Sequence, residues 1–227
     1  GDMGDRLALR IAGVFSLLSV AVLVATIVLG ISAGRAPGPI DFSQSVVLQQ
    51  LYRTREEVIL LSLLALIAPV LALPAGIGWH LLLRQLGGHV TLGVALWYFG
   101  MLLVIWQDAA EYTLVRYLPA AYVPNAELPL STGLVAAGSV LGKLIETATM
   151  VGDLVSFGGV ILVAAGVWQM GGRWRILGGL GAFSAVMIMT SFFGTSLEPV
   201  RLPGLILFMA WMAGMGAAML RTKPVQG

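Results

Sequence analysis

The stretch that decides the fold is Leu130–Met170, LSTGLVAAGSVLGKLIETATMVGDLVSFGGVILVAAGVWQM, which runs for 41 residues without a proline. A helix that crosses a bilayer core of about 30 Å needs roughly 20 apolar residues, and this run contains more than enough. Lys143, Glu146 and Asp153 lie within it. Ionisable groups next to a bilayer are costly and require partners, water or a function. The run therefore predicts a membrane helix that carries a candidate site.

The composition of the whole chain is that of a membrane protein. Hydrophobic residues make up 58% of the 227 residues and charged residues only 11%, whereas an ordinary soluble domain has about 25% charged residues. No polar block is longer than a loop, so we expect one transmembrane domain over residues 1–227. The absence of cysteine excludes disulfides and thiolate metal sites. The net charge of +2 does not indicate nucleic-acid binding.

Six segments are long and apolar enough to cross a membrane. They lie at about residues 7–31, 58–83, 91–110, 151–170, 176–196 and 202–220. The apolar stretch of the first exceeds the roughly 7–15 residues of a signal-peptide core, so we interpret it as a retained helix. The sequence predicts an all-α integral membrane protein, built as a bundle of six transmembrane helices.

The distribution of basic residues predicts the orientation in the membrane. An even number of spans puts both termini on one side. Both termini and both tight links between spans, Arg84–Val90 and Gly171–Arg175, are basic, and short basic loops face the cytoplasm. Trp79, Trp168 and Trp174 fall near the same ends of the spans, as expected of an interfacial aromatic belt. We therefore expect a multi-pass protein with cytoplasmic N- and C-termini.

The two longer links have helical patterning of their own. Apolar residues recur at helical spacing in Phe42–Glu57, before the second span, and in Ser131–Met150, before the fourth. We therefore expect transmembrane helices 2 and 4 to extend beyond the membrane into an extracytoplasmic cap. Pro119, Pro124 and Pro129 predict an irregular external loop between these two extensions.

Two carboxylates reach the same depth in the membrane. Counted from the cytoplasmic ends of their spans, Asp108 and Asp153 each stand 17 residues up the helix, which is about 25 Å. Lys143 and Glu146 lie higher, above the hydrocarbon. Two like charges in a poorly solvated site suit proton or cation binding, so we expect an outward-facing polar cavity with the aspartates at its floor. The candidate ligand-, proton- or cation-binding residues are Asp108, Glu111, Lys143, Glu146 and Asp153.

The charged residues at the outer ends of the helices have a second interpretation. They can neutralise one another and hold the extended helices together without any ligand. The residues that would form such an ion-pair cap are Arg53, Arg55, Glu57, Arg116, Glu198 and Arg201. The sequence leaves both interpretations open.

Several chemical functions are disfavoured by what the chain lacks. It contains no HExxH, no GxSxG, no paired-aspartate metal motif and no glycine-rich phosphate loop. His80 and His89 both fall near the cytoplasmic face, where two histidines are poorly placed to hold a membrane haem. We therefore expect no catalytic residue, no metal site and no cofactor.

Small residues recur on several helix faces and allow helices to approach closely. Such faces are formed by Gly138 and Gly142 on the extended fourth helix, ahead of its span, by Ala210, Gly214 and Ala218 on the sixth, and by Gly158, Gly159, Gly178, Gly179 and Gly181 between the fourth and fifth. We expect tight packing there, with a homo-oligomer or a membrane complex as an alternative use of the same faces.

Three stretches of the chain carry a resemblance to a family: RIAGVFSLL (Arg10–Leu18), QQLYRTREEVILLSLL (Gln49–Leu64) and GVWQMGGRWRILGGLGAF (Gly166–Phe183). In the last, a span is followed by a short glycine–basic turn and by an RxLG sequence that opens the next helix. These stretches resemble a bacterial family of six-helix integral membrane proteins catalogued only as a domain of unknown function. The resemblance implies the six-helix topology and a place in the bacterial cytoplasmic (inner) membrane, and it implies no functional residue.

These observations favour a non-enzymatic protein that binds or transports a small or lipid-like ligand through the outward-facing cavity. An interaction or scaffold subunit of a membrane complex is the alternative. A membrane enzyme acting on lipid is a second alternative, with the acidic pair as its candidate groups. The expected partners are the lipid bilayer and this ligand. We expect no nucleic-acid partner.

Overall fold

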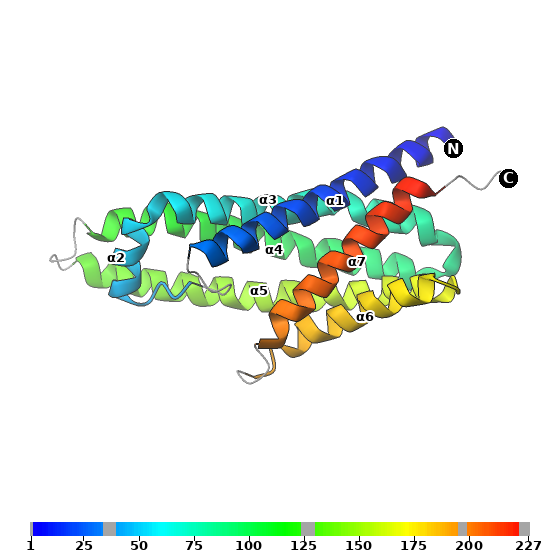
Figure 1. Cartoon of the computed structure of the whole chain (residues 1–227). Helices are drawn as coiled ribbons and strands as arrows, with labels where there is room; N and C mark the ends of the chain where they lie inside the picture. Colours follow the sequence, from blue (N-terminus) through cyan, green and yellow to red (C-terminus); the bar gives the residue numbers. More distant parts are fainter. Residues whose placement is uncertain (1, 34–39, 124–129, 195–198, 223–227) are drawn as a thin grey trace.

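The computed structural model describes residues 2–33, 40–123, 130–194 and 199–222, and every regular element in these ranges is helical (Figure 1). The long helices are α1 (Asp2–Ser32), α3 (Arg55–Leu83), α4 (Gly88–Tyr122), α5 (Leu130–Gln169), α6 (Trp174–Thr190) and α7 (Arg201–Arg221). The short elements are the helix α2 (Ser45–Arg53) and the 3-10 turn η1 (Arg84–Leu86). The prediction of an all-helical protein is confirmed.

Five of the helices, α1, α3, α4, α5 and α7, are long and apolar enough to cross a membrane. The sixth long helix, α6, has 17 residues, which is the lower limit of the roughly 17–25 residues of a spanning helix. Large apolar side chains such as Leu102, Phe183 and Ile206 stay exposed on the outside of the bundle. Exposed apolar surface of this kind suits contact with lipid and not with water. The fold is therefore that of a helical, multi-pass membrane protein.

The six long helices in the described part of the chain form a closed ring. Each helix packs against its neighbours along the chain, and the ring closes where α7 packs against α1. Figure 1 shows both chain ends, η1 and the α5–α6 turn at one end of the molecule. At this end Arg84 forms an ion pair with Asp5 of α1, with 3.1 Å between Nη2 and Oδ2. The glycines that make these tight turns possible are Gly87, Gly171 and Gly172, which have positive φ angles.

Tryptophan side chains fill the interior of the ring toward the end that holds η1. The ring of Trp79 lies 4.9 Å from that of Trp97 on α4 and 5.0 Å from that of Trp211 on α7. All three side chains are fully buried. The prediction that Trp79 belongs to an interfacial belt is wrong, because α3 turns this indole toward the interior, where it gains aromatic contacts from two other helices.

The helices α4 and α5 approach so closely that their backbones are in contact at glycines. Gly93 faces Gly159, and seven residues along each helix Gly100 faces Gly152. A methyl group on Gly100 would lie 2.6 Å from the carbonyl oxygen of Gly152. A seven-residue repeat keeps one side of a helix against its partner over several turns. Glycine is required at these positions because any side chain would force the helices apart.

The glycine face predicted between the fourth and fifth spans is divided in the structure. Gly178 of α6 packs against the backbone of α5 at Ala164 and Trp168, as expected. Gly159 instead packs against α4, and Gly158 has no atom of another element within 4 Å. Adjacent residues of a helix point about 100° apart, so the two glycines cannot serve the same contact.

The second transmembrane helix does not continue through Phe42–Glu57 as one helix, and that prediction is wrong. The helix breaks at Thr54, whose backbone N–H and hydroxyl both donate to the carbonyl oxygen of Gln50, at 3.1 and 3.2 Å. Past this break α2 turns away from α3 and lies against α4 (Figure 1). In this arrangement Leu48 and Leu51 of α2 are buried.

The helix α4 is longer than the predicted span 91–110. It continues to Tyr122 and places Val115 and Leu118 in a second hydrophobic cluster with the buried residues of α2. This burial explains the additional length of α4. Figure 1 shows α3, α4 and α5 reaching beyond α1 and α7 at the end of the molecule that holds α2. Pro119 lies inside α4 and not in an irregular loop, which corrects the prediction; Pro124 and Pro129 fall outside the described residues.

The close approach of α4 and α5 is tested by Gly100→Ala. The new methyl group would meet the backbone of α5 at Ser156 and Gly152, and overpacking of this kind costs about 1–3 kcal/mol. We expect a lower melting temperature in a thermal unfolding experiment in detergent. Gly158→Ala is the matched control, because that position on α5 is open. Equal melting temperatures for the two variants would contradict the packing described here.

Candidate functional site

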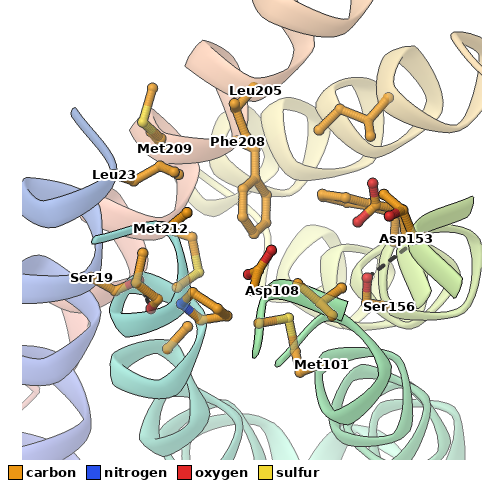
Figure 2. A pocket seen from close by; sticks show the side chains of 18 of the residues that line it. Ser19, Leu23, Met101, Asp108, Asp153, Ser156, Leu205, Phe208, Met209 and Met212 are labelled. Atoms are coloured by element: carbon orange, nitrogen blue, oxygen red, sulfur yellow. Dashed lines mark hydrogen bonds between the residues drawn. The ribbon is translucent and has the colours of Figure 1, made fainter. Parts of the chain in front are cut away.

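A cavity of about 270 Å³ lies inside the ring, and residues from all six long helices line it. This volume is close to the lower end of ligand pockets, which measure about 300–1,000 Å³. Most of the lining side chains are apolar, among them Leu23, Phe208 and Met212 (Figure 2). Asp108 and Asp153 both contribute to the wall. The structure therefore brings together the two carboxylates that the sequence places at equal depth.

The charged part of the cavity and its apolar part lie at different levels of the bundle. On α4, Asp108 lies farther than Trp97 from the end that holds η1, and on α5, Asp153 lies farther from that end than Phe157. Arg201 occupies the corresponding level at the start of α7. The cavity therefore has an apolar floor toward the tryptophan cluster and a charged region toward the end that holds α2.

Asp153 is paired with Arg201. The Nη2 atom of Arg201 donates to Oδ2 of Asp153 at 3.0 Å. The carboxylate side chain is 14% exposed and the guanidinium side chain 37%, and the guanidinium also lies 5.0 Å from the centre of the Phe192 ring. Sequence reasoning placed Arg201 in the ion-pair cap, whereas the structure places it in the wall of the cavity.

Asp108 has a neutral partner. The side-chain amide of Gln107 donates to Oδ1 of Asp108 at 2.8 Å. Within the described ranges, no basic side chain forms an ion pair with Asp108 or with Glu111, which lies one helical turn farther along α4. Glu111 and Asp153 are both close enough to act electrostatically on Asp108. The charged region of the cavity wall thus contains two carboxylates and one guanidinium, and Glu111 is not among the residues that line the cavity.

Lys143 and Glu146, which were predicted as binding residues, lie outside the cavity. The Nζ atom of Lys143 donates to Oε2 of Glu146 at 2.7 Å, and the two side chains are 78% and 55% exposed. They lie on the part of α5 that extends toward α2, where water can solvate them. The structure therefore does not bring this pair to the two aspartates.

The residues of the predicted ion-pair cap mostly make other contacts. Arg55 donates to the backbone carbonyl of Arg116 at 3.3 Å, and Arg116 donates to the hydroxyl of Tyr112 at 2.9 Å. Arg53 and Glu57 are exposed. In the part of the chain that the structure describes, none of these four charged residues forms an ion pair. Glu198, the remaining acidic member, lies outside the described residues.

Polar residues that sequence reasoning missed also line the cavity. Ser19 of α1 donates to the carbonyl of Ala68 on α3 at 2.8 Å, close to the proline Pro69 that interrupts the hydrogen bonding of that helix. Ser156 donates to the carbonyl of Asp153 at 3.2 Å (Figure 2). The sequence gives little signal for them, because a lone serine is common in membrane helices. Gln107 could have been found, since it directly precedes Asp108.

Comparisons of the chain with family models, with curated proteins and with solved structures found no match. The resemblance to a six-helix family of unknown function therefore stays a prediction. Over the described ranges there is also no group of three or more histidine, aspartate or glutamate residues that could hold a metal ion.

The Asp153–Arg201 pair should be energetically coupled. Arg201→Gln leaves the largely buried carboxylate without its partner, which costs about 3–5 kcal/mol in a fully buried pair. Because Arg201 is 37% exposed, we expect a smaller loss of unfolding free energy, about 1–3 kcal/mol. Adding Asp153→Asn should recover most of this loss, since an amide needs no counter-charge. Thermal or denaturant unfolding in detergent would measure all four members of this cycle.

The control for this cycle is the exposed pair Lys143–Glu146. The same cycle of amide substitutions there should give a coupling of only about 0–1 kcal/mol, because water screens the charges. A coupling for Asp153 and Arg201 that is no larger than this control would show that their ion pair does not contribute to stability.

Proposed function

We propose that this protein binds a small amphipathic ligand in the cavity, and that binding or transport is its function. The observation that carries this proposal is the division of the wall into an apolar region, with Trp97 and Met212, and a charged region, with Asp108 and Arg201. A ligand with an apolar body and a polar end suits such a wall, because each part finds a matching partner when it leaves water. The volume of about 270 Å³ favours a small molecule over a whole two-chain lipid.

Binding is favoured over catalysis by the state of the polar side chains in the wall. The hydroxyls of Ser19 and Ser156 both donate to backbone carbonyls, and the carboxylate of Asp153 is engaged by Arg201. A hydroxyl nucleophile would instead donate to a general base. The scaffold alternative also has less support, because two of the glycines predicted to bind a partner, Gly138 and Gly214, pack within the chain.

We infer that all six long helices cross the membrane, with the end that holds both termini in the cytoplasm. The basic residues Arg84, Arg173, Arg175 and Arg221 lie at or beside this end (Figure 1), and short basic segments face the cytoplasm. The short helix α6 would span a locally thinned bilayer. The second hydrophobic cluster, formed by α2 and the ends of α4 and α5, would then be the extracytoplasmic cap. The bacterial inner membrane is the location that the family resemblance implies.

Filling the cavity tests the proposed function. Leu205→Trp places a larger side chain in the cavity wall, whereas Ile206→Trp adds the same group to the exposed face of the same helix. We expect mass spectrometry of gently purified protein to find a small amphipathic molecule with the wild type and with Ile206→Trp, and to lose it with Leu205→Trp. Retention of the same molecules by all three proteins, or of none by the wild type, would contradict the proposal.

The orientation can be tested by thiol labelling without background from native residues, because the chain contains no cysteine. Gln49→Cys puts a thiol on the exposed face of α2, and Gln85→Cys puts one in the turn η1 at the opposite end. In cells whose outer membrane is permeable and whose cytoplasmic membrane is intact, we expect a membrane-impermeant maleimide to label only Gln49→Cys. Labelling of Gln85→Cys alone would reverse the orientation.

A further inference from the structure

We propose that the ligand is an organic monocation with an apolar body, and that its positive end lies against Asp108 at the charged region of the cavity. This inference rests on the proposed function, ligand binding in the cavity. It adds the chemical class of the ligand, which the shape of the cavity alone does not give.

The first argument is the balance of charge around the cavity. Arg201 is already paired with Asp153. Asp108 has only an amide partner, and no basic side chain among the described residues forms an ion pair with Glu111. The lining residues from α1, α3 and α6 contribute no charged side chain. A carboxylate at this depth is stable only with a counter-charge, a proton or water. A ligand cation supplies the counter-charge that these described residues lack.

The second argument is the aromatic wall beneath the carboxylates. The ring of Phe208 lies 5.0 Å from that of Phe157 and 6.0 Å from that of Trp97, and all three line the cavity. Figure 2 shows the Phe208 ring and the Asp108 carboxylate directed toward the same space. Aromatic faces attract organic ammonium groups and also accept apolar bodies. An inorganic cation has no apolar body to bury against such a wall.

Methionine contributes to the remaining apolar contact. Met101, Met209 and Met212 line the cavity from α4 and α7. Their flexible thioether side chains adapt to bodies of different shape, as on other surfaces that bind several partners. We therefore infer selectivity for charge and size, with tolerance for the shape of the apolar body.

Three probes of nearly equal shape separate charge from shape. Benzyltrimethylammonium is the cation, neopentylbenzene is its neutral isostere and phenylmethanesulfonate is the anion. We expect isothermal titration of the full chain in a non-ionic detergent to show that the cation binds at least about tenfold more tightly than the neutral probe. The anion should bind most weakly, because the carboxylates outnumber the guanidinium.

Variants locate the positive end of the probe. Asp108→Asn should weaken binding of the cation by about tenfold or more and leave the neutral probe unaffected. Glu57→Gln removes the same charge from an exposed position outside the cavity and should change neither affinity. Asp108→Glu keeps the charge and should keep most of the affinity, which provides a readout if the asparagine variant folds poorly.

The pH dependence gives a readout that needs no variant. A quaternary ammonium ion keeps its charge at every pH, so any change must come from the protein. The groups that surround the site are Asp108 and Glu111 on α4, Asp153 on α5 and Arg201 on α7. Protons compete with the cation for the carboxylates, so its affinity should fall as the pH is lowered toward the ordinary pKa of a carboxyl group, about 4, while that of the neutral probe stays constant.

The outcomes distinguish this inference from the function on which it rests. If the neutral or anionic probe binds as tightly as the cation, and Leu205→Trp abolishes that binding, the cavity is a ligand site and the cation proposal is overturned. Cation binding that is independent of pH and of Asp108→Asn also overturns it. If no probe binds in a manner sensitive to Leu205→Trp, the proposed function itself fails.

Discussion

The backbone contact between α4 and α5 is the constraint on which the site depends. Lipid tails are as apolar as leucine, so helices in a membrane associate through close van der Waals contact and not through expulsion of water. Glycines provide that contact at Gly93–Gly159 and at Gly100–Gly152. Gly152 directly precedes Asp153, and Asp108 follows Gly100 by about two turns of α4. The register that brings the backbones together therefore also sets both carboxylates in the wall of one cavity.

Position relative to this contact determines how each charged residue is stabilised. Asp153 lies within the ring and is paired with a guanidinium from α7, a helix that begins 48 residues later in the chain. Lys143 lies ten residues earlier on the same helix, and its pair with Glu146 is exposed. Charges on one apolar helix thus have different environments, because only part of α5 is enclosed by other helices. This difference separates a candidate binding group from an ordinary surface pair.

The sequence was sufficient to predict the long apolar helices and to place the two aspartates at one level of the bundle, because hydropathy and a rise of about 1.5 Å per residue are enough for both. It could not predict which distant residue completes the site. Arg201 meets Asp153 only because α7 closes the ring, and Trp79 is buried only because two other helices bring indoles to it. The break at Thr54 has the same origin, since the gain comes from burying Leu48 and Leu51 in the second hydrophobic cluster.

The small residues that line the cavity explain why the interior is not filled. Ala65, Ala68 and Ala72 of α3 and Ser19 of α1 occupy positions where leucine would close the space, and Ser19 bonds to the backbone of α3 instead. Small side chains at these positions therefore keep a space open beside Asp108, a carboxylate that has an amide partner and no ion pair among the described residues.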